Sequence, residues 1–111
     1  MEGSEDMFRR LKCDIYLEND IYYIEADIPG YKKDNIKITY KNNLLLIIAH
    51  RDIDNKRNYL VHDRHYNRLF GNYIMKNVDE KLIEAKYEDG VLYIVAPLKK
   101  ESNEKKTIEI K

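Results

Sequence analysis

Apolar and polar residues alternate with a period of two along most of this chain of 111 residues, and this pattern constrains the fold more than any other feature. Such alternation places one side of a β-strand on a core and the other side toward water. Turn-forming residues separate eight predicted strands, at 13–17, 22–28, 36–40, 44–51, 59–66, 68–75, 82–87 and 91–96. Because no helix of useful length intervenes, the sequence predicts an all-β fold, an antiparallel β-sandwich.

The N-terminal residues depart from this pattern. Residues 4–12 are compatible with a short helix that has Ser4 as its N-cap and Met7 and Leu11 on one face. A helix of about nine residues is marginal in water, so it would have to dock on another element.

The C-terminal residues return to apolar character after a polar stretch. Residues 99–106 contain no apolar residue, and we expect a solvated linker there. Ile108 and Ile110 would then project from one face of an extended tail. Residues 99–107 span at most about 30 Å, which lets the tail reach a groove on its own domain or on a neighbour. The alternative is a final strand of the same sheet.

Composition excludes several classes of protein. The chain has 20 Lys+Arg and 20 Asp+Glu, so its formal net charge is zero and neither nucleic acid nor a membrane is expected as a partner. No apolar run approaches the ~20 residues needed to span a bilayer. One cysteine permits no intramolecular disulfide, which fits a reducing, cytoplasmic location.

A search for catalytic or metal-binding residues finds little. The serines, Ser4 and Ser102, lie in the predicted tails, where a rigid triad is difficult to build. In a strand, His62 and His65 would face opposite sides and could not ligate one metal together. The alternation favours Cys13 as a small core residue. We therefore expect no enzyme, no catalytic residue, no metal and no cofactor.

Exposed apolar surface is a stronger indication of function. The run 44–49 is apolar on both strand faces, so Leu45, Ile47 and Ala49 can fill the core while their neighbours point away. Residues 91–96 are likewise apolar on both strand faces. Either loops or the N-terminal helix cover these second faces, or the faces bind other proteins.

Several short motifs occur in a characteristic order. The most specific is Ala85-Lys86-Tyr87-Glu88-Asp89-Gly90-Val91-Leu92, followed by Pro97, which is similar to an A-x-x-x-x-G-V-L signature. It is supported by Glu25-Ala26-Asp27-Ile28-Pro29-Gly30, by 34–38, by Asp63-Arg64-His65-Tyr66 and by the I-x-I element Ile108-Glu109-Ile110. With these motifs, residues 13–111 resemble the small heat-shock proteins of bacterial type through their α-crystallin domain.

The resemblance implies an immunoglobulin-like sandwich in residues 13–98, a short N-terminal arm in 1–12 and a flexible C-terminal extension in 99–111. It implies an ATP-independent holdase chaperone of the stress response, which binds partly unfolded proteins and prevents their aggregation. It also implies a homodimer formed by strand exchange and higher oligomers formed through the tail.

The resemblance further implies two sets of site residues. A strand carried by the loop 52–58 would pair with residues 13–17 of the partner, through Tyr59, Val61, Asp63, Arg64, His65 and Tyr66. A groove between the strands at 36–40 and 82–87 would accept Ile108 and Ile110. Its lining residues would be Ile36, Ile38, Tyr40, Ile83 and Ala85.

The sequence departs from the family pattern at three positions. Asn67 stands where glycine is frequent, Gly71 where arginine is common and Leu98 where lysine usually follows the proline. Gly71 would remove an ion pair of the dimer interface or of the subunit. Members also usually carry a longer apolar arm than the twelve residues that precede this domain.

The second hypothesis is an adaptor or co-chaperone module on the related CS-type sandwich, which would dock one folded partner. The predicted strand at 59–66 and the I-x-I tail argue against this hypothesis, because that class usually lacks both.

Overall fold

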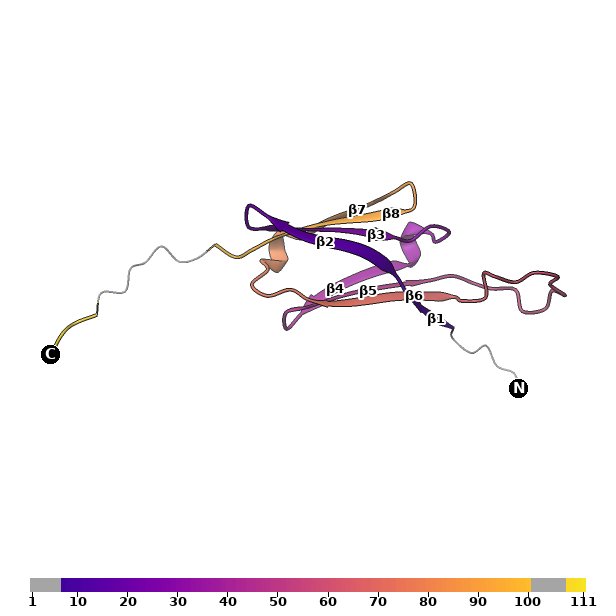
Figure 1. The fold of residues 1–111 in the computed structure, drawn as a ribbon, viewed down its shortest axis with the longest axis horizontal. Coiled ribbons are helices and arrows are strands. Elements are labelled where there is room, and N and C mark those ends of the chain that lie inside the picture. Colours follow the sequence, from indigo (N-terminus) through magenta and orange to yellow (C-terminus); the bar gives the residue numbers. More distant parts are fainter. Residues whose placement is uncertain (1–6, 101–107) are drawn as a thin grey trace.

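The computed structural model of the chain describes residues 7–100 and 108–111. Eight strands form two four-stranded sheets that pack face to face (Figure 1), in the orders β1-β6-β5-β4 and β2-β3-β8-β7. The strands are β1 (Phe8–Arg10), β2 (Lys12–Glu18), β3 (Ile21–Asp27), β4 (Ile36–Lys41), β5 (Leu44–His50), β6 (Arg68–Ile74), β7 (Glu84–Glu88) and β8 (Val91–Pro97). Two 3₁₀ helices, η1 (Lys33–Asn35) and η2 (Glu80–Leu82), complete the elements. The predicted all-β sandwich is confirmed.

The core lies between the two sheets and follows the predicted alternation. Leu45, Ile47 and Ala49 of β5 are fully buried, as the apolar run 44–49 predicted. They face the inward residues of the opposite sheet, and this set comprises Ile24, Ala26, Ile28, Leu92, Ile94 and Ala96. Burying these side chains contributes about 1.5–3 kcal/mol for each large one, which makes this layer the main source of stability.

Two-residue turns set the register of three antiparallel pairs. Each joins consecutive strands, and both turn residues have positive φ: Asn19 and Asp20, Asn42 and Asn43, and Asp89 and Gly90. Asn, Asp and Gly tolerate this conformation, which matches the twist of the flanking strands. Turn-forming residues therefore separate these strands, as the sequence predicts.

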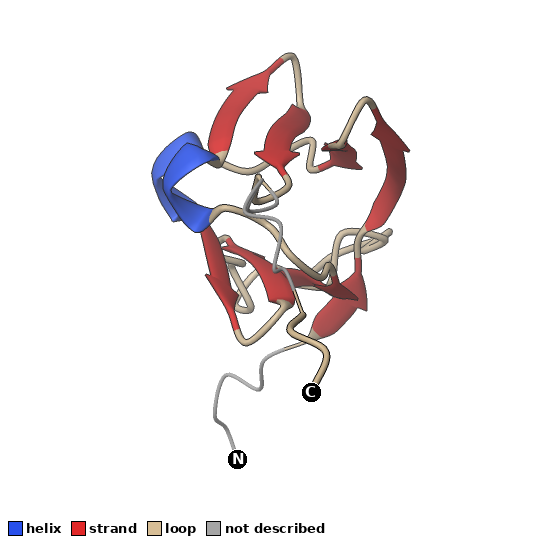
Figure 2. Ribbon diagram, turned by 90° about the vertical axis from the view of Figure 1, so that its left-hand side faces the viewer, coloured by secondary structure: helices blue, strands red, loops and turns tan. Residues whose placement is uncertain are grey.

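One buried residue joins the two sheets at one side of the sandwich. Leu11 connects β1 of the first sheet to β2 of the second and is 5% exposed. β1 and β2 therefore share a side, and β4 and β7, the last strands of the two sheet orders, lie at the opposite side. The 3₁₀ helices that precede β4 and β7 also lie on one side of the sandwich in an end view (Figure 2), although they are at opposite ends of it in Figure 1.

The helix predicted for residues 4–12 is wrong over the described part, because Phe8–Arg10 forms a strand parallel to β6. Ser4 lies outside the described residues. Backbone pairing holds the strand: the Met7 carbonyl accepts from the amides of Asn67 and Arg68, and the Asn67 side chain accepts from the Met7 amide at 2.8 Å. The isolated helix would have lacked such partners.

The strand predicted for 59–66 does not form within this chain. Residues 51–67 instead make an irregular loop that extends past the end of the sheets (Figure 1). A β-strand needs a neighbour for its backbone hydrogen bonds, and none of the strands within 7–100 pairs with this segment. Among the described residues, no helix is long and apolar enough to cross a membrane.

Candidate functional site

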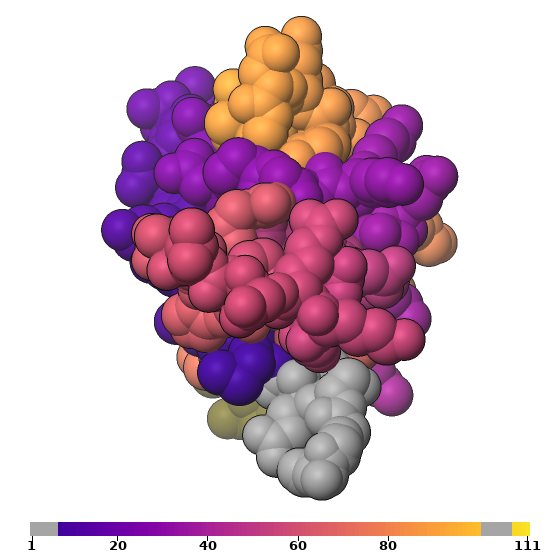
Figure 3. Space-filling model, turned by 90° about the vertical axis from the view of Figure 1, so that its right-hand side faces the viewer, coloured from indigo at the N-terminus to yellow at the C-terminus, as the bar shows by residue number. Residues whose placement is uncertain are grey.

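A loop of seventeen residues, 51–67, forms much of the surface at one end of the molecule, and we call it the long loop (rose in Figure 3). Arg51 holds the two ends of this loop together, and we call its contacts the clamp. The Arg51 guanidinium donates to the Tyr66 carbonyl through Nε at 3.2 Å and through Nη2 at 3.0 Å. Nη2 also lies 3.4 Å from the Arg64 carbonyl oxygen. One side chain therefore ties the beginning of the loop to its end.

The same guanidinium lies over two aromatic rings. Its carbon is 4.7 Å from the ring centroid of Tyr66 and 5.0 Å from that of Tyr31. Burial raises the pKa of the Tyr31 hydroxyl above its usual value, and the nearby Arg51 charge opposes part of this effect. Tyr31 is therefore neutral at pH 7, and its ring serves as a cation–π surface for the clamp.

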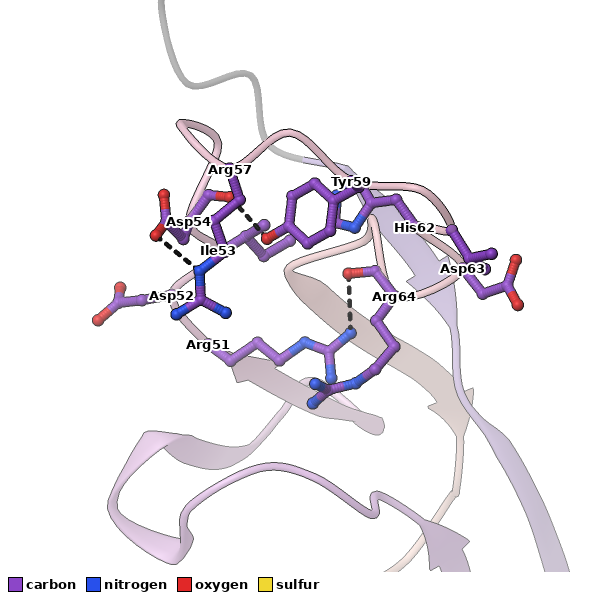
Figure 4. A pocket seen from close by; sticks show the side chains of 10 residues that line it. Arg51, Asp52, Ile53, Asp54, Arg57, Tyr59, His62, Asp63 and Arg64 are labelled. Atoms are coloured by element: carbon purple, nitrogen blue, oxygen red, sulfur yellow. Dashed lines mark hydrogen bonds and ion pairs between the residues drawn. The ribbon is translucent and has the colours of Figure 1, made fainter.

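The tip of the long loop is ordered by its own polar contacts (Figure 4). The Tyr59 hydroxyl donates to the Asp54 carbonyl at 2.6 Å, and the Tyr59 ring stacks on His62 with 3.8 Å between centroids. Asp54 also forms an ion pair with Arg57 at 3.0 Å. These contacts surround a polar hollow, but the described part of the chain contains no group of three potential metal ligands.

Two apolar side chains of the loop point into solvent. Leu60 is 99% exposed and Val61 is 73% exposed. Of the six residues assigned to the dimer strand, the structure brings Arg64 and Tyr66 to the clamp at Arg51, whereas Tyr59 lies at the tip with His62. Asp63 and His65 are exposed on the loop surface. Within this chain the six residues do not form one continuous extended strand.

The outer edge of β2 is open. β2 pairs only with β3, so the backbone groups on its other edge have no strand neighbour in the described chain. Ile15 and Leu17 lie on the inward side of this strand, yet both are exposed. Cys13, predicted as a core residue, is half-buried and packs against the core.

Inward residues at the opposite side of the sandwich are also incompletely covered, and we call this region the β4–β7 seam. Ile36, Ile38 and Tyr40 pair with fully buried positions of β5 but are only half-buried. Ile83, just before β7, is half-buried, and Ala85 is exposed although it pairs with the buried Ile94. The five residues assigned to the tail groove therefore lie along the two edge strands that flank this seam.

Sequence reasoning missed one residue of the seam, Tyr87, and one exposed apolar residue shortly before β7, Leu82. Tyr87 shares the side of Ala85, and its hydroxyl lies 2.6 Å from the Ile28 carbonyl oxygen and 3.0 Å from that of Tyr31. The period of two from Ile83 through Ala85 could have identified it. Leu82 is half-exposed at the end of η2, where no alternation pointed to it.

The tail residues do not occupy the seam in this structure. Ile108 is 79% exposed and Ile110 is 95% exposed. Leu98, where lysine is usual in the resembled family, packs half-buried against the core, and its amide donates to the Asp20 carbonyl at 2.9 Å. Leu98 therefore closes the end of the sandwich from which the tail departs.

Comparison with known proteins assigns the family. Residues 14–111 match the model of the Hsp20/alpha crystallin family. The chain is 41% identical over 93 residues to the 18 kDa heat shock protein of Clostridium acetobutylicum, with 79% of this chain and 62% of that protein covered. It is 35% identical over 98 residues to heat shock protein HSP.16.4 of Streptococcus thermophilus, with 84% and 68% covered. The matched region thus spans less than two thirds of the Clostridium protein.

Solved structures agree on the fold. A small heat-shock protein from Xylella fastidiosa superposes with a TM-score of 0.73 at 21% identity, covering 91% of this chain and 95% of that one. Heat shock protein 16.0 from Schizosaccharomyces pombe superposes with a TM-score of 0.72 at 23% identity, covering 93% and 76%.

Small heat-shock proteins are ATP-independent chaperones and not enzymes. The family therefore agrees with the expectation that the chain is not an enzyme. It does not favour the adaptor hypothesis. The sandwich topology, the sequence relatives and the match over residues 14–111 lead to one conclusion: this chain belongs to the Hsp20/alpha crystallin family of small heat-shock proteins.

Proposed function

We propose that this chain is an ATP-independent holdase of the cytoplasm, which binds apolar segments of partly unfolded proteins and prevents their aggregation. The observation that carries the proposal is that inward-facing apolar residues remain accessible at both open sides of the sandwich, at Ile15 and Leu17 and along the β4–β7 seam. Burying client apolar surface there stabilises a complex by about 25 cal/mol per Å², before the cost of ordering the client. Such binding is weak and reversible.

The active unit is a dimer formed by strand exchange. In this arrangement residues 59–66 of the long loop leave their own chain and pair with the open edge of β2 in the partner. The exposure of Leu60 and Val61 supports the exchange, because a strand laid on the partner would cover such side chains. The apolar residues Ile15 and Leu17 at the receiving edge support it as well.

The tail acts as a reversible cover for the seam. We assign residues 13–98 to the domain, 1–12 to a short arm whose segment Phe8–Arg10 pairs with the domain as β1, and 99–111 to the extension that carries Ile108 and Ile110. Inserting these two side chains beside Ile38 and Ala85 would link one dimer to the next. Release of the tail would then expose the seam to clients.

Light scattering from a heated or reduced client protein, with no nucleotide present, tests the holdase activity. We expect suppression near one subunit per client. Ile38→Ser should weaken suppression, whereas Thr39→Ala, on the outward side of the same strand, should not. Thermal unfolding of both variants separates lost binding from lost folding. A monomer that binds one folded partner and suppresses no aggregation would overturn the proposal.

The mass of the native particle tests the exchange. Leu60→Ser combined with Val61→Ser should shift the equilibrium from dimer to monomer at low protein concentration. Arg57→Ala is the matched control, because Arg57 lies on the same loop and its side chain pairs with Asp54 of its own chain. A dimer of unchanged stability in the Leu60/Val61 variant would contradict strand exchange through this loop.

A further inference from the structure

The outward face of the sheet β1-β6-β5-β4 is positively charged, and we call it the basic face. The strand registers place Lys37 beside Ile48, Lys41 beside Leu44, and Arg10 beside Phe70, all on the side away from the core. Arg68 lies on the same side, next to Phe8. None of the outward positions of these four strands holds a carboxylate, so the face carries a net charge of +4.

The outward face of the sheet β2-β3-β8-β7 has the opposite sign, and we call it the acidic face. Its outward positions hold two lysines and six carboxylates, a net charge of −4. The carboxylates are Asp14, Glu18, Glu25, Asp27, Glu84 and Glu88, and the lysines are Lys12 and Lys86. The formal net charge of the chain is zero, but the two outward faces of the sandwich carry opposite charges.

Both faces also present apolar side chains among the charges. Ile74 is 75% exposed on the basic face, with the exposed Phe8 and Leu44 on the same sheet. On the acidic face, Tyr16 stacks on Tyr23 with 5.1 Å between ring centroids. Each face therefore has the composition of an interface, in which apolar contacts lie within a charged surround.

The acidic face contains a repulsive pair that a cation would relieve. Asp14 lies directly opposite Glu25 on the β2–β3 ladder, and like charges in this position are destabilising. These two carboxylates line a shallow hollow together with Asp27 and Lys12, and this single lysine leaves the four groups with a net charge of −2. On the basic face, Lys37 and Lys41 are exposed and form no ion pair within residues 7–100.

We infer that the basic face of one chain stacks on the acidic face of a second copy, with lysines of β4 directed toward the hollow at Asp14 and Glu25. The second copy is favoured as the occupant because both complementary surfaces, of equal and opposite charge and similar extent, are present on one chain. The contact is heterologous, so it can repeat from copy to copy rather than close a pair. It is separate from the proposed strand exchange and tail insertion, which use the edge of β2 and the β4–β7 seam and not the outward faces.

The size of the faces predicts a weak, salt-sensitive contact. With strands about 4.8 Å apart and three to seven residues long, the basic face covers about 360 Å² and the acidic face about 410 Å². Two such faces bury about 770 Å², below the range of stable interfaces. Charge attraction must therefore contribute much of the binding, and it is screened over about 10 Å at 0.1 M salt.

Charge substitutions test the inference by sedimentation velocity of the full chain. Lys37→Glu with Lys41→Glu cancels the charge of the basic face, and Glu25→Lys with Glu84→Lys cancels that of the acidic face. We expect association beyond the dimer at low salt for the unsubstituted chain, weakened at least about tenfold in either variant. A mixture of the two variants should associate again, because each retains the intact face that the other lacks.

Lys99→Glu with Lys100→Glu is the matched control, since these exposed lysines lie outside both faces. Repeating the measurement with Ile108→Ser and Ile110→Ser removes any contribution of the tail, and face-dependent association should persist. Salt-independent association, or a mixture that behaves like its components, would overturn the inference. So would binding of the Lys37/Lys41 face to phosphatidylglycerol vesicles without self-association. Suppression of client aggregation is measured separately, so failure of the holdase proposal can be distinguished from failure of this inference.

Discussion

The ring of Tyr73 lies over Gly71 on the inward side of β6. A Cβ placed on Gly71 would be 2.5 Å from the Tyr73 hydroxyl oxygen and 2.8 and 2.9 Å from two ring carbons. The Arg10 guanidinium lies 5.3 Å from the centroid of the same ring. The arginine that the family pattern places at Gly71 therefore has no room here, because Tyr73 occupies the space in front of that position.

Gly71→Ala should destabilise the chain by about 1–2 kcal/mol. The new methyl group overlaps the Tyr73 ring, so the ring must leave its position against the core, and such overpacking typically costs this much. Chemical denaturation measures the free energy of unfolding. In a Tyr73→Ala background, Gly71→Ala should be neutral or stabilising, because the obstruction is gone and alanine restricts the unfolded chain. Equal destabilisation in both backgrounds would show that the two residues are not coupled.

The hydroxyl of Tyr73 should make the stability depend on pH in the alkaline range. Burial, assisted by hydrogen bonding to Cys13, raises its pKa from 10.0 to about 12. The neutral form is thus favoured in the folded state, so this contribution is complete below pH 10 and is lost as the pH rises from 10 through 12. Denaturation curves at pH 9 to 12 should show a shallower decline for Tyr73→Phe than for the unsubstituted chain. Parallel declines would contradict the assignment.

Arg51→Lys should loosen the long loop although the charge is kept. Lysine cannot reproduce two parallel donors to the Tyr66 carbonyl or lie flat on the Tyr31 and Tyr66 rings. We expect a loss of about 1–2 kcal/mol and faster proteolysis within residues 52–65. Arg57→Lys is the control, because the Arg57–Asp54 pair is exposed and contributes little. Equal protease sensitivity of the two variants would contradict the role of Arg51 as a clamp.

Local alternation was sufficient to predict the central strands. The exposure of residues on the edge strands depends on tertiary contacts. Leu45, Ile47 and Ala49 are buried as expected because their strand has neighbours on both edges. Ile15 and Leu17 follow the same alternation, but they lie on an edge strand and remain exposed. Alternation identifies the inward side of a strand, whereas coverage of that side depends on which strands lie beside it.

Two differences between the predicted elements and this structure have the same origin. Phe8–Arg10 became a strand through contacts with residues about sixty positions away, which no local pattern encodes. Residues 59–66 have the composition of a strand but pair with no strand among the described residues. Ile36, Ile38 and Tyr40 lie on β4 as their local alternation predicted, and their role in a groove stays a prediction. The clamp at Arg51 was missed because a single arginine gives no periodic signal.

Ile108→Ser combined with Ile110→Ser should reduce assembly beyond the dimer while the domain stays folded. Both side chains are almost fully exposed, so their removal costs the domain no core contact. Their loss would instead remove the apolar surface that we propose inserts in the β4–β7 seam of a neighbour. Native mass at physiological salt measures the change, and unfolding temperature measures the fold. Glu109→Ser is the matched control, because in an extended tail Glu109 points away from the side shared by the two isoleucines. An unchanged native mass in the double variant would mean that higher assembly depends on other surfaces, whereas an equal loss in the control would indicate that tail charge, and not apolar insertion, holds the particles together.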